Sequence, residues 1–273
     1  MLAEARDGAW LAYDVHGEGE PLLLIMGLSG SRRAWYRLRP WLVPRCRTIA
    51  LDNRGTGDSD RVTGPLTMDD LVTDAVAVLD AAGVDRAHVL GVSMGGMVAQ
   101  HLALDHRDRV RSLVLGCTTA GGRRGSPPWR LLSATALRPV VGITRTFPLV
   151  VPALYARTTR EQHPRRVEED LRIRLADATD VRTTLAQMTA VARHDTRARL
   201  GELAGLDVTV IHGAEDALVP PYAGRALAAA IPGARLVMIP ACGHMLTTDA
   251  EEVAARAVLA HLERASSRSP AAA

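Results

Sequence analysis

A serine between glycines is the residue best placed to do chemistry. Residues 91–96 read Gly-Val-Ser-Met-Gly-Gly, so Ser93 stands in the pattern Gly-x-Ser-x-Gly. The mostly apolar run 86–90 predicts a buried strand before it, and the apolar spacing of 97–104 predicts a helix after it. Strand, pattern and helix together are typical of a nucleophile elbow, in which larger residues at Gly91 and Gly95 would collide with the strained turn. We therefore predict that Ser93 is a catalytic nucleophile.

Two later loops supply the partners that a nucleophilic serine needs. A serine hydroxyl attacks poorly at neutral pH unless a base takes its proton. Asp216 follows the apolar run 208–211, and His244 follows the run 235–239. Serine, acid and histidine, each in a loop after a strand and in this order, match the triad arrangement that accompanies such an elbow. We predict His244 as the general base and Asp216 as the carboxylate that orients it.

Each partner has a competitor. Glu215 is the nearest alternative to Asp216, and Asp216 alone would read as a turn residue. His212 is the nearest alternative to His244, although a histidine at a strand end more often packs or bonds locally. Cys242 stands two residues before His244 but lacks an elbow, which disfavours thiol chemistry.

Negative charge that develops on a carbonyl oxygen during acyl transfer needs two backbone N–H donors. The first is expected from Met94, directly after the nucleophile. The second is expected from Leu28, in the loop after the apolar run 22–26. Only backbone atoms donate, so the side chains at these positions are free to vary.

Strand and helix patterns alternate along most of the chain. This alternation predicts an α/β fold with a mostly parallel, doubly wound sheet covered by helices on both faces. A capping box of Thr67 and Asp70 starts one helix, and Thr248 with Glu251 is expected to cap the last, which ends near Arg264. The expected strands are 10–15, 22–26, 47–51, 86–90, 110–115, 208–211 and 235–239.

The alternation stops at residue 121. A Gly- and Pro-rich linker follows, and only helical spacing is found up to about residue 203. We predict a core of residues 1–121 and 204–266, a helical cap of 122–203, and a disordered tail of 267–273. The expected cap helices are 128–138, 143–156, 160–177 and 179–194.

The cap is basic, with 15 Arg against 8 Asp plus Glu, a local charge of +7 against −4 for the remainder. This asymmetry favours an anionic substrate, or it reflects arginines that solvate helix faces, which is the commoner case. Apolar residues in the cap and beside the motifs are candidates for the substrate pocket, although residues at helical spacing also form cap core. They are Met26, Trp35, Met97, Trp129, Phe147, Tyr155, Met188 and Met245.

Composition narrows the remaining possibilities. Aromatic residues are only 3% of the chain, which argues against stacking on nucleic acid. No apolar stretch approaches the roughly 18 to 20 residues of a spanning helix, and the N-terminus lacks a signal-peptide pattern. The three cysteines are too few and too far apart for a disulfide framework or a zinc site, and the absence of lysine excludes lysine-based catalysis. We expect a cytoplasmic monomer or homodimer that acts on a small molecule, without cofactor, metal, nucleic acid or membrane partner.

The sequence resembles the alpha/beta-hydrolase superfamily over roughly residues 8–264, in Gly27-Leu28, the loop 52–59, the elbow, 213–216 and Gly243-His244. It is most similar to enol-lactonases and small-molecule esterases, including methylesterases. The resemblance implies hydrolysis of a carboxylic ester or lactone through an acyl-enzyme. The loop 52–59 lacks the lysine of a phosphate-binding P-loop, and we expect a structural role in which Arg54 pins backbone carbonyls and supports the oxyanion loop. Met26 stands where the family usually has histidine. C–C bond hydrolysis, cofactor-free peroxidase or oxygenase chemistry, and non-catalytic ligand binding stay open as alternatives.

Overall fold

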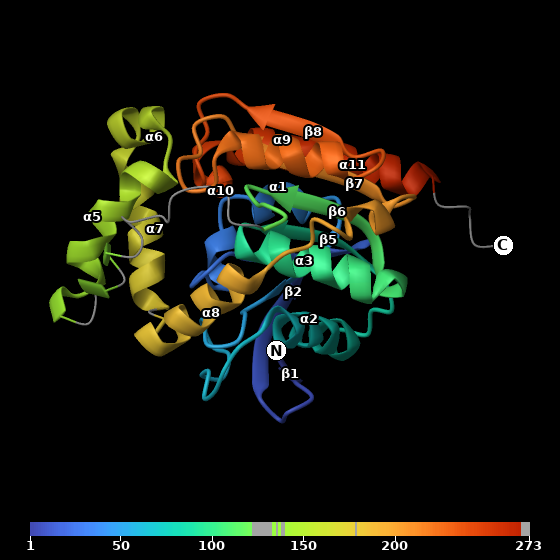
Figure 1. The fold of residues 1–273 in the computed structure, drawn as a ribbon, viewed down its shortest axis with the longest axis horizontal. Coiled ribbons are helices and arrows are strands. Elements are labelled where there is room, and N and C mark those ends of the chain that lie inside the picture. Colours follow the sequence, from blue (N-terminus) through green and yellow to red (C-terminus); the bar gives the residue numbers. More distant parts are fainter. Residues whose placement is uncertain (122–132, 135, 138–139, 178, 269–273) are drawn as a thin grey trace.

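The computed structural model describes residues 1–121, 133–134, 136–137, 140–177 and 179–268, and it is built around one eight-stranded sheet (Figure 1). The strand order is β1-β2-β4-β3-β5-β6-β7-β8. The strands are β1 (Leu2–Glu4), β2 (Trp10–His16), β3 (Pro21–Ile25), β4 (Arg47–Leu51), β5 (Ala87–Val92), β6 (Val110–Gly116), β7 (Asp207–Gly213) and β8 (Arg235–Ile239).

The sheet is parallel from β4 to β8, and at one edge β2 pairs antiparallel with both β4 and β1. All seven predicted strands are present. The additional strand β1 has three residues, too few for an apolar pattern to reveal it. The carboxyl ends of the parallel strands therefore share one edge, where the loops that carry the predicted chemistry emerge.

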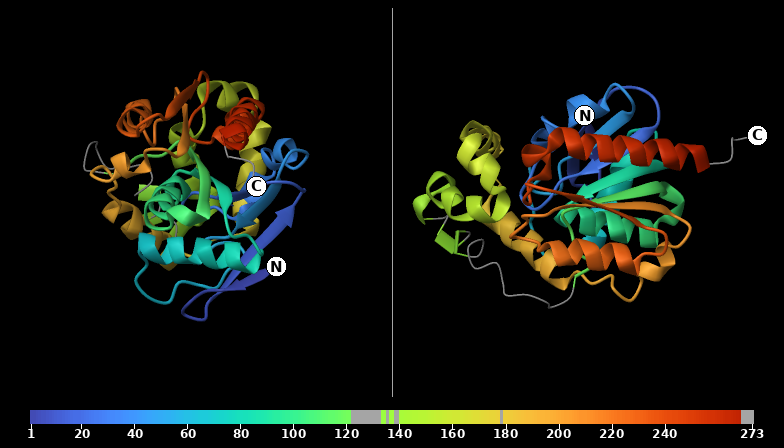
Figure 2. Two further views of the ribbon diagram at one scale, coloured as in Figure 1. Left: turned by 90° about the vertical axis from the view of Figure 1, so that its right-hand side faces the viewer. Right: turned by 90° about the horizontal axis from the view of Figure 1, so that it is seen from above.

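Helices cover both faces of the sheet (Figure 2). On one face, α2 (Met68–Ala81), α3 (Met94–Asp105) and α9 (Pro221–Ala230) contribute to the larger apolar core. On the other face, α1 (Arg39–Leu42) and α11 (Glu251–Arg268) contribute to a second core. Short helices η1 (Arg32–Trp35), η2 (Arg107–Arg109), η3 (Leu200–Leu203) and α10 (Leu246–Asp249) fill the connections. The predicted capping box of α2 is present, with Thr67 and Asp70 bonded to each other's backbone N–H groups.

The predicted start and end of the last helix were wrong. Thr248 lies inside α10, and its hydroxyl donates to Asp170 Oδ2 at 2.7 Å instead of capping α11. Glu251 accepts hydrogen bonds from Arg166 in the insertion. The helix also continues to Arg268, past the expected end near Arg264, while residues 269–273 of the predicted tail lie outside the described residues.

A helical insertion lies between β6 and β7 at the edge where the strands end, with α5, α6 and α7 projecting beyond the sheet (Figures 1 and 2). Its helices are α5 (Ile143–Leu154), α6 (Arg157–Gln162), α7 (Pro164–Ala176) and α8 (Val181–Arg193). The predicted helix 160–177 is divided because Pro164 starts a new helix, and most of the predicted helix 128–138 falls outside the described residues. In the described part of the chain, no helix combines the length and apolarity needed to cross a membrane.

The two ends of the insertion meet. Gly121 and Asp195 form an antiparallel bridge, and Thr196 N donates to Ala120 O at 2.9 Å. Inside the insertion, Phe147, Val150, Leu154 and Tyr155 form a small apolar cluster of their own. Leu218 and Met245 from the core pack against this cluster, so the insertion is seated directly over the loops that follow β7 and β8.

Candidate active site

Ser93 occupies the turn between β5 and α3 in a conformation that few residues adopt, with φ 57° and ψ −121°. A side chain on Gly91 would overlap the carbonyl oxygen of Gly95. A side chain on Gly95 would overlap the carbonyl oxygens of Ile25 and Met26. The glycines of the motif are therefore required because backbone approaches them closely on both sides of the turn. This geometry is that of the nucleophile elbow predicted from the sequence.

His244 links Ser93 to Asp216. Its Nε2 lies 2.9 Å from Ser93 Oγ, and its Nδ1 lies 2.8 Å from Asp216 Oδ2. A carboxylate oxygen only accepts, so Nδ1 carries the proton and Nε2 is left to accept the hydrogen bond of the Ser93 hydroxyl. Asp216 and His244 are both buried. The structure thus brings the three predicted residues into one hydrogen-bonded chain.

The second oxygen of Asp216 is occupied by backbone. Oδ1 accepts from Leu218 N at 2.9 Å and from Val219 N at 2.8 Å. These bonds hold the carboxylate in one orientation and leave Oδ2 for His244. The carboxylate is therefore positioned by its own loop after β7, before any ligand binds.

The competing residues have other partners. Glu215 accepts a hydrogen bond from Arg157 N at 3.0 Å. His212 Nε2 lies 2.9 Å from the carbonyl oxygen of Val219, which makes it a donor there. Burial lowers the pKa of His212 and keeps its imidazole neutral. His212 Nε2 also lies 3.5 Å from Asp216 Oδ2, but neither Glu215 nor His212 is hydrogen-bonded to His244 or Ser93.

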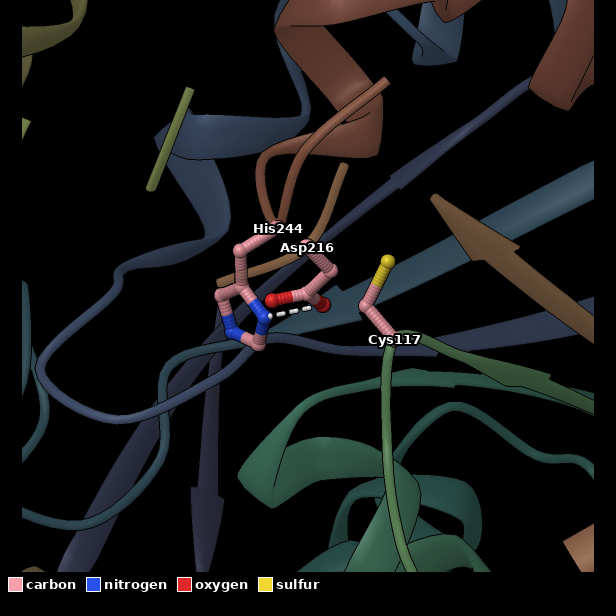
Figure 3. A group of neighbouring side chains, drawn as sticks. All are labelled: Cys117, Asp216 and His244. Atoms are coloured by element: carbon pink, nitrogen blue, oxygen red, sulfur yellow. Dashed lines mark hydrogen bonds and ion pairs between the residues drawn. The ribbon is translucent and has the colours of Figure 1, made fainter. Parts of the chain in front are cut away.

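Cys117 lies beside the same carboxylate (Figure 3). The potential ligand atoms of Cys117, Asp216 and His244 lie within 4.8 Å of one another. Complete burial, together with the nearby Asp216, raises the pKa of the Cys117 thiol well above its ordinary value, whereas a metal would require the thiolate. Both ring nitrogens of His244 are also committed to Ser93 and Asp216. The described residues of this cluster fit a proton relay better than a metal centre.

The loop after β3 runs directly past Ser93. A Cβ added to Gly27 would stand 3.0 Å from the Ser93 Cβ, so the backbone of this loop passes beside the nucleophile. Leu28, the predicted second oxyanion donor, is the next residue. Met94, the predicted first donor, is the first residue of α3, where the backbone N–H groups are not used by the helix itself.

Two side chains from elsewhere hold this loop. Asn53 Nδ2 donates to Met26 O at 2.9 Å. Gln187, from α8 of the insertion, accepts from Ser29 N at 2.8 Å and donates to Arg54 O at 3.2 Å. The guanidinium of Arg54 does not pin backbone carbonyls as expected, because it pairs with Asp74 and Asp7. Asn53 and Gln187 therefore make the hydrogen bonds to loop backbone that were expected of Arg54.

A cavity of about 140 Å³ opens between the core and the insertion and reaches Ser93 and His244. Its wall is mostly apolar, with contributions from the loop after β3, from α5, and from the loops after β7 and β8. The described residues that line it are Met26, Gly27, Leu28, Ser29, Gly30, Val92, Ser93, Ala134, Ile143, Thr146, Phe147, Val150, Leu154, Arg174, Thr184, Leu218, His244, Met245 and Thr247.

Three of the eight residues predicted for the pocket line this cavity, namely Met26, Phe147 and Met245. Trp35 and Met97 instead belong to the two cores of the sheet. Tyr155 is buried in the insertion, where its hydroxyl donates to Asp170 at 2.8 Å.

The last two predicted pocket residues also contribute nothing to the described wall. Met188 is a partly buried residue of α8 that does not line the cavity. Trp129 lies outside the described residues. Sequence reasoning also passed over the polar lining residues Thr146, Arg174, Thr184 and Thr247, because it selected by apolarity and a hydroxyl or guanidinium carries no periodic signal.

Comparison with known proteins agrees with this architecture. Residues 20–250 match the family model described as the alpha/beta hydrolase fold. A relative from Azorhizobium caulinodans, named "Putative carbamate hydrolase RutD", is 33% identical over 234 residues, which are 84% of this chain and 86% of the relative.

Two solved structures overlay nearly the whole chain. A thermophilic esterase from Thermogutta terrifontis aligns with a TM-score of 0.85 at 26% identity, covering 97% of this chain and 98% of the esterase. The enol-lactonase from Burkholderia xenovorans LB400 aligns with a TM-score of 0.86 at 25% identity, covering 96% of this chain and 100% of the lactonase. With a matching family model, an eight-stranded mostly parallel sheet and a helical insertion between β6 and β7, the chain belongs to the alpha/beta hydrolase fold family.

Proposed function

We propose that this alpha/beta-fold hydrolase cleaves a carboxylic ester or lactone of a small to medium, partly apolar molecule through an acyl-enzyme. The observation that carries the proposal is the unbroken line of hydrogen bonds from Asp216 through His244 to Ser93, which ends in a mostly apolar cavity. The names of the similar esterase and enol-lactonase support the same class of bond.

In the first half of the reaction, Ser93 Oγ attacks the carbonyl carbon while His244 Nε2 takes its proton. Asp216 stabilises the imidazolium that forms, because its Oδ2 accepts the Nδ1 proton. The oxyanion of the tetrahedral intermediate accepts hydrogen bonds from the backbone N–H groups of Met94 and Leu28. When the intermediate collapses, the alkoxide oxygen leaves with the proton from His244, and Ser93 is acylated.

In the second half, water replaces the leaving oxygen. His244 Nε2 takes a proton from this water, and the resulting hydroxide attacks the acyl carbon. Collapse of the second intermediate returns the proton to Ser93 Oγ and releases a carboxylic acid. For a lactone, the alcohol and the acid belong to one product molecule.

A fluorophosphonate probe followed by mass spectrometry tests the nucleophile. We expect covalent labelling of Ser93 in the folded protein, and no labelling of Ser93→Ala at that position. Turnover of p-nitrophenyl esters, lactones, methyl esters and carbamates is then compared between the two proteins. Loss of the nucleophile is expected to lower kcat by at least about 1,000-fold for every substrate that the wild type accepts.

Ser267→Ala is the matched control, since Ser267 is an exposed serine at the far end of α11. It should label and turn over like the wild type. Full turnover by Ser93→Ala would overturn the proposal and favour chemistry without a serine nucleophile, such as C–C bond hydrolysis or cofactor-free oxygenation.

A further inference from the structure

One cation stands in the cavity wall. Arg174, on α7 of the insertion, lines the same cavity as Ser93, and apart from the imidazole of His244 no other titratable side chain is among the described lining residues. The guanidinium contacts two uncharged groups, a thioether sulfur and an aromatic ring. Nη2 lies 3.7 Å from Met245 Sδ, and the guanidinium carbon lies 5.9 Å from the centre of the Phe147 ring. Neither contact neutralises the guanidinium.

No carboxylate within the described residues lies within 4.0 Å of Arg174. The segments outside them, 122–132, 135, 138–139, 178 and 269–273, contain no Asp or Glu at all. The absence of an acidic side-chain partner therefore does not depend on how those segments are arranged.

The two acidic residues closest to Arg174 along α7 are already engaged. Asp170, one turn earlier, accepts from Tyr36 at 2.8 Å through Oδ1. Its Oδ2 accepts from Tyr155 at 2.8 Å and from Thr248 at 2.7 Å. Asp177, at the end of the helix, accepts hydrogen bonds from Ser31 and Arg33. Neither carboxylate has a free orientation to offer Arg174.

Other partly buried arginines of this protein donate to an oxygen acceptor, which is either a carboxylate or a backbone carbonyl, as for Arg47 with Ala82 O and Arg160 with Tyr155 O. Arg54 is paired with Asp74 and Asp7, and Arg32 with Asp52 and Asp58. A charge that is partly withdrawn from water normally needs such a partner, because desolvation is costly. Arg174 is thus an incompletely partnered cation at a substrate cavity, which is the arrangement expected of a residue that binds an anionic ligand.

We infer that Arg174 is a specificity-determining residue that binds a carboxylate of the substrate, placed away from the bond that is cleaved. The inference rests on the proposed function and narrows it to esters or lactones that carry a free carboxylate. A carboxylate fits better than a phosphate, because one planar guanidinium matches two carboxylate oxygens with parallel N–H donors. A dianionic phosphate would need further donors, and the hydroxyls of Thr146 and Thr184 in this wall already donate to backbone carbonyls.

The test compares anionic and neutral esters of one length. The substrates are the mono-p-nitrophenyl esters of adipic, pimelic and suberic acid, each paired with its methyl-capped neutral counterpart. These chains are long enough to limit attack by the substrate's own carboxylate. We expect the wild type to prefer the anion over its neutral counterpart by at least about tenfold in kcat/KM at the best chain length.

Three variants assign the preference to the residue. Arg174→Gln should abolish it, mainly by raising KM for the anionic ester relative to the KM for its neutral counterpart. Arg174→Lys keeps the charge but not the planar fork, so it should retain part of the preference. Arg172→Gln removes the same charge from an exposed position two residues away and should behave like the wild type.

The outcomes separate this inference from the proposed function. If the wild type labels at Ser93 and hydrolyses both esters equally, the substrate carboxylate is not recognised and the inference is overturned, while the hydrolase proposal stands. An anion preference that survives in both Arg174→Gln and Arg174→Lys would also overturn it. If the wild type neither labels nor turns over any ester, the proposed function itself fails. Should Arg174→Gln not fold, the reduced preference of Arg174→Lys relative to Arg172→Gln decides.

Discussion

Ser93 is held in its unusual backbone conformation by four hydrogen bonds, one of which runs from Met97 N to the Ser93 carbonyl at 3.2 Å. Its N–H donates to Gly116 O at 2.9 Å, and its carbonyl accepts from Gly96 N at 3.0 Å and from Thr118 Oγ1 at 2.7 Å. A residue outside the favoured regions costs on the order of 1–3 kcal/mol, which these bonds and the surrounding core offset. The strain is therefore maintained by β6 and α3, not by the serine alone.

Gly95→Ala tests how tightly this turn is packed. The new Cβ would overlap two backbone carbonyl oxygens, which cannot move aside like a flexible side chain. We expect the free energy of unfolding, measured by urea denaturation, to fall by more than about 3 kcal/mol, together with loss of ester turnover. In Gly64→Ala, where the space around the new Cβ is open, unfolding should change by less than about 1 kcal/mol. An unchanged midpoint in Gly95→Ala would contradict the packing described for the elbow.

Helix α7 is the element that docks the insertion onto the core. Its Asp170 accepts hydrogen bonds from the hydroxyl groups of Tyr36 and Thr248, which lie outside the insertion. It also accepts one from the hydroxyl of Tyr155 within the insertion. Its Arg166 forms a two-bond pair with Glu251 at the start of α11. These contacts explain why the insertion sits at one place over the cavity.

Asp170→Ala should loosen that docking. The variant leaves buried hydroxyl groups without their acceptor, which is expected to cost about 2–4 kcal/mol in the free energy of unfolding. Because the cavity lies between the insertion and the core, KM for esters should rise as well. Glu168→Ala, on the exposed side of the same helix, should change unfolding by less than about 0.5 kcal/mol. Equal stability of the two variants in urea would show that Asp170 does not dock the insertion.

At the scale of the whole molecule, buried histidines tie the helices to the sheet. His261 of α11 lies 2.7 Å from Ser112 Oγ on β6 and 2.9 Å from Thr209 Oγ1 on β7. His88 Nδ1 lies 2.6 Å from the same Ser112 hydroxyl. Burial lowers the pKa of His261 to about 4 and also lowers the pKa of His88. Both imidazoles are therefore neutral in the folded protein near neutral pH.

This cluster predicts loss of stability in mild acid. Between about pH 6.5 and pH 4 the unfolded chain binds a proton at residue 261 that the folded chain does not, so the free energy of unfolding falls as the pH falls. The shift corresponds to a loss on the order of 3 kcal/mol for this one histidine. Urea denaturation of the wild type and His261→Gln at pH 7 and pH 4.5 measures it, and the variant should show the shallower pH dependence. His16→Gln, which removes an exposed histidine, should keep the wild-type slope, and the same slope in His261→Gln would refute the assignment.

The strands could be predicted because each is an apolar run. The three residues of the relay could be predicted because each lies in a glycine-containing loop directly after such a run. Sequence reasoning failed where tertiary contacts decided the outcome. Thr248 satisfies the local rule for a helix cap, yet the buried Asp170 takes its hydroxyl. The apolar side chain of Trp35 indicated that it would be buried, but not that it would lie in a core of the sheet instead of the substrate pocket. Arg174 is one of 15 arginines in the predicted cap, and among the described ones it is distinguished by lining the cavity that reaches Ser93, a position that only the fold reveals.

The bridge between Gly121 and Asp195 joins the two ends of the insertion at one point of the core. An inserted segment that leaves and re-enters at one point can be exchanged without disturbing strand pairing, which makes it a natural unit of recombination. Helix α8 does not belong to the exchangeable segment, because its Gln187 is hydrogen-bonded to the loop beside the nucleophile. The segment from α5 to α7 can then be exchanged for one with another substrate range, provided that the core partners of Asp170 and Arg166 are kept, while α8 stays with the chemistry. Grafts that aim to transfer substrate range between relatives should therefore end before Asp180, which caps α8.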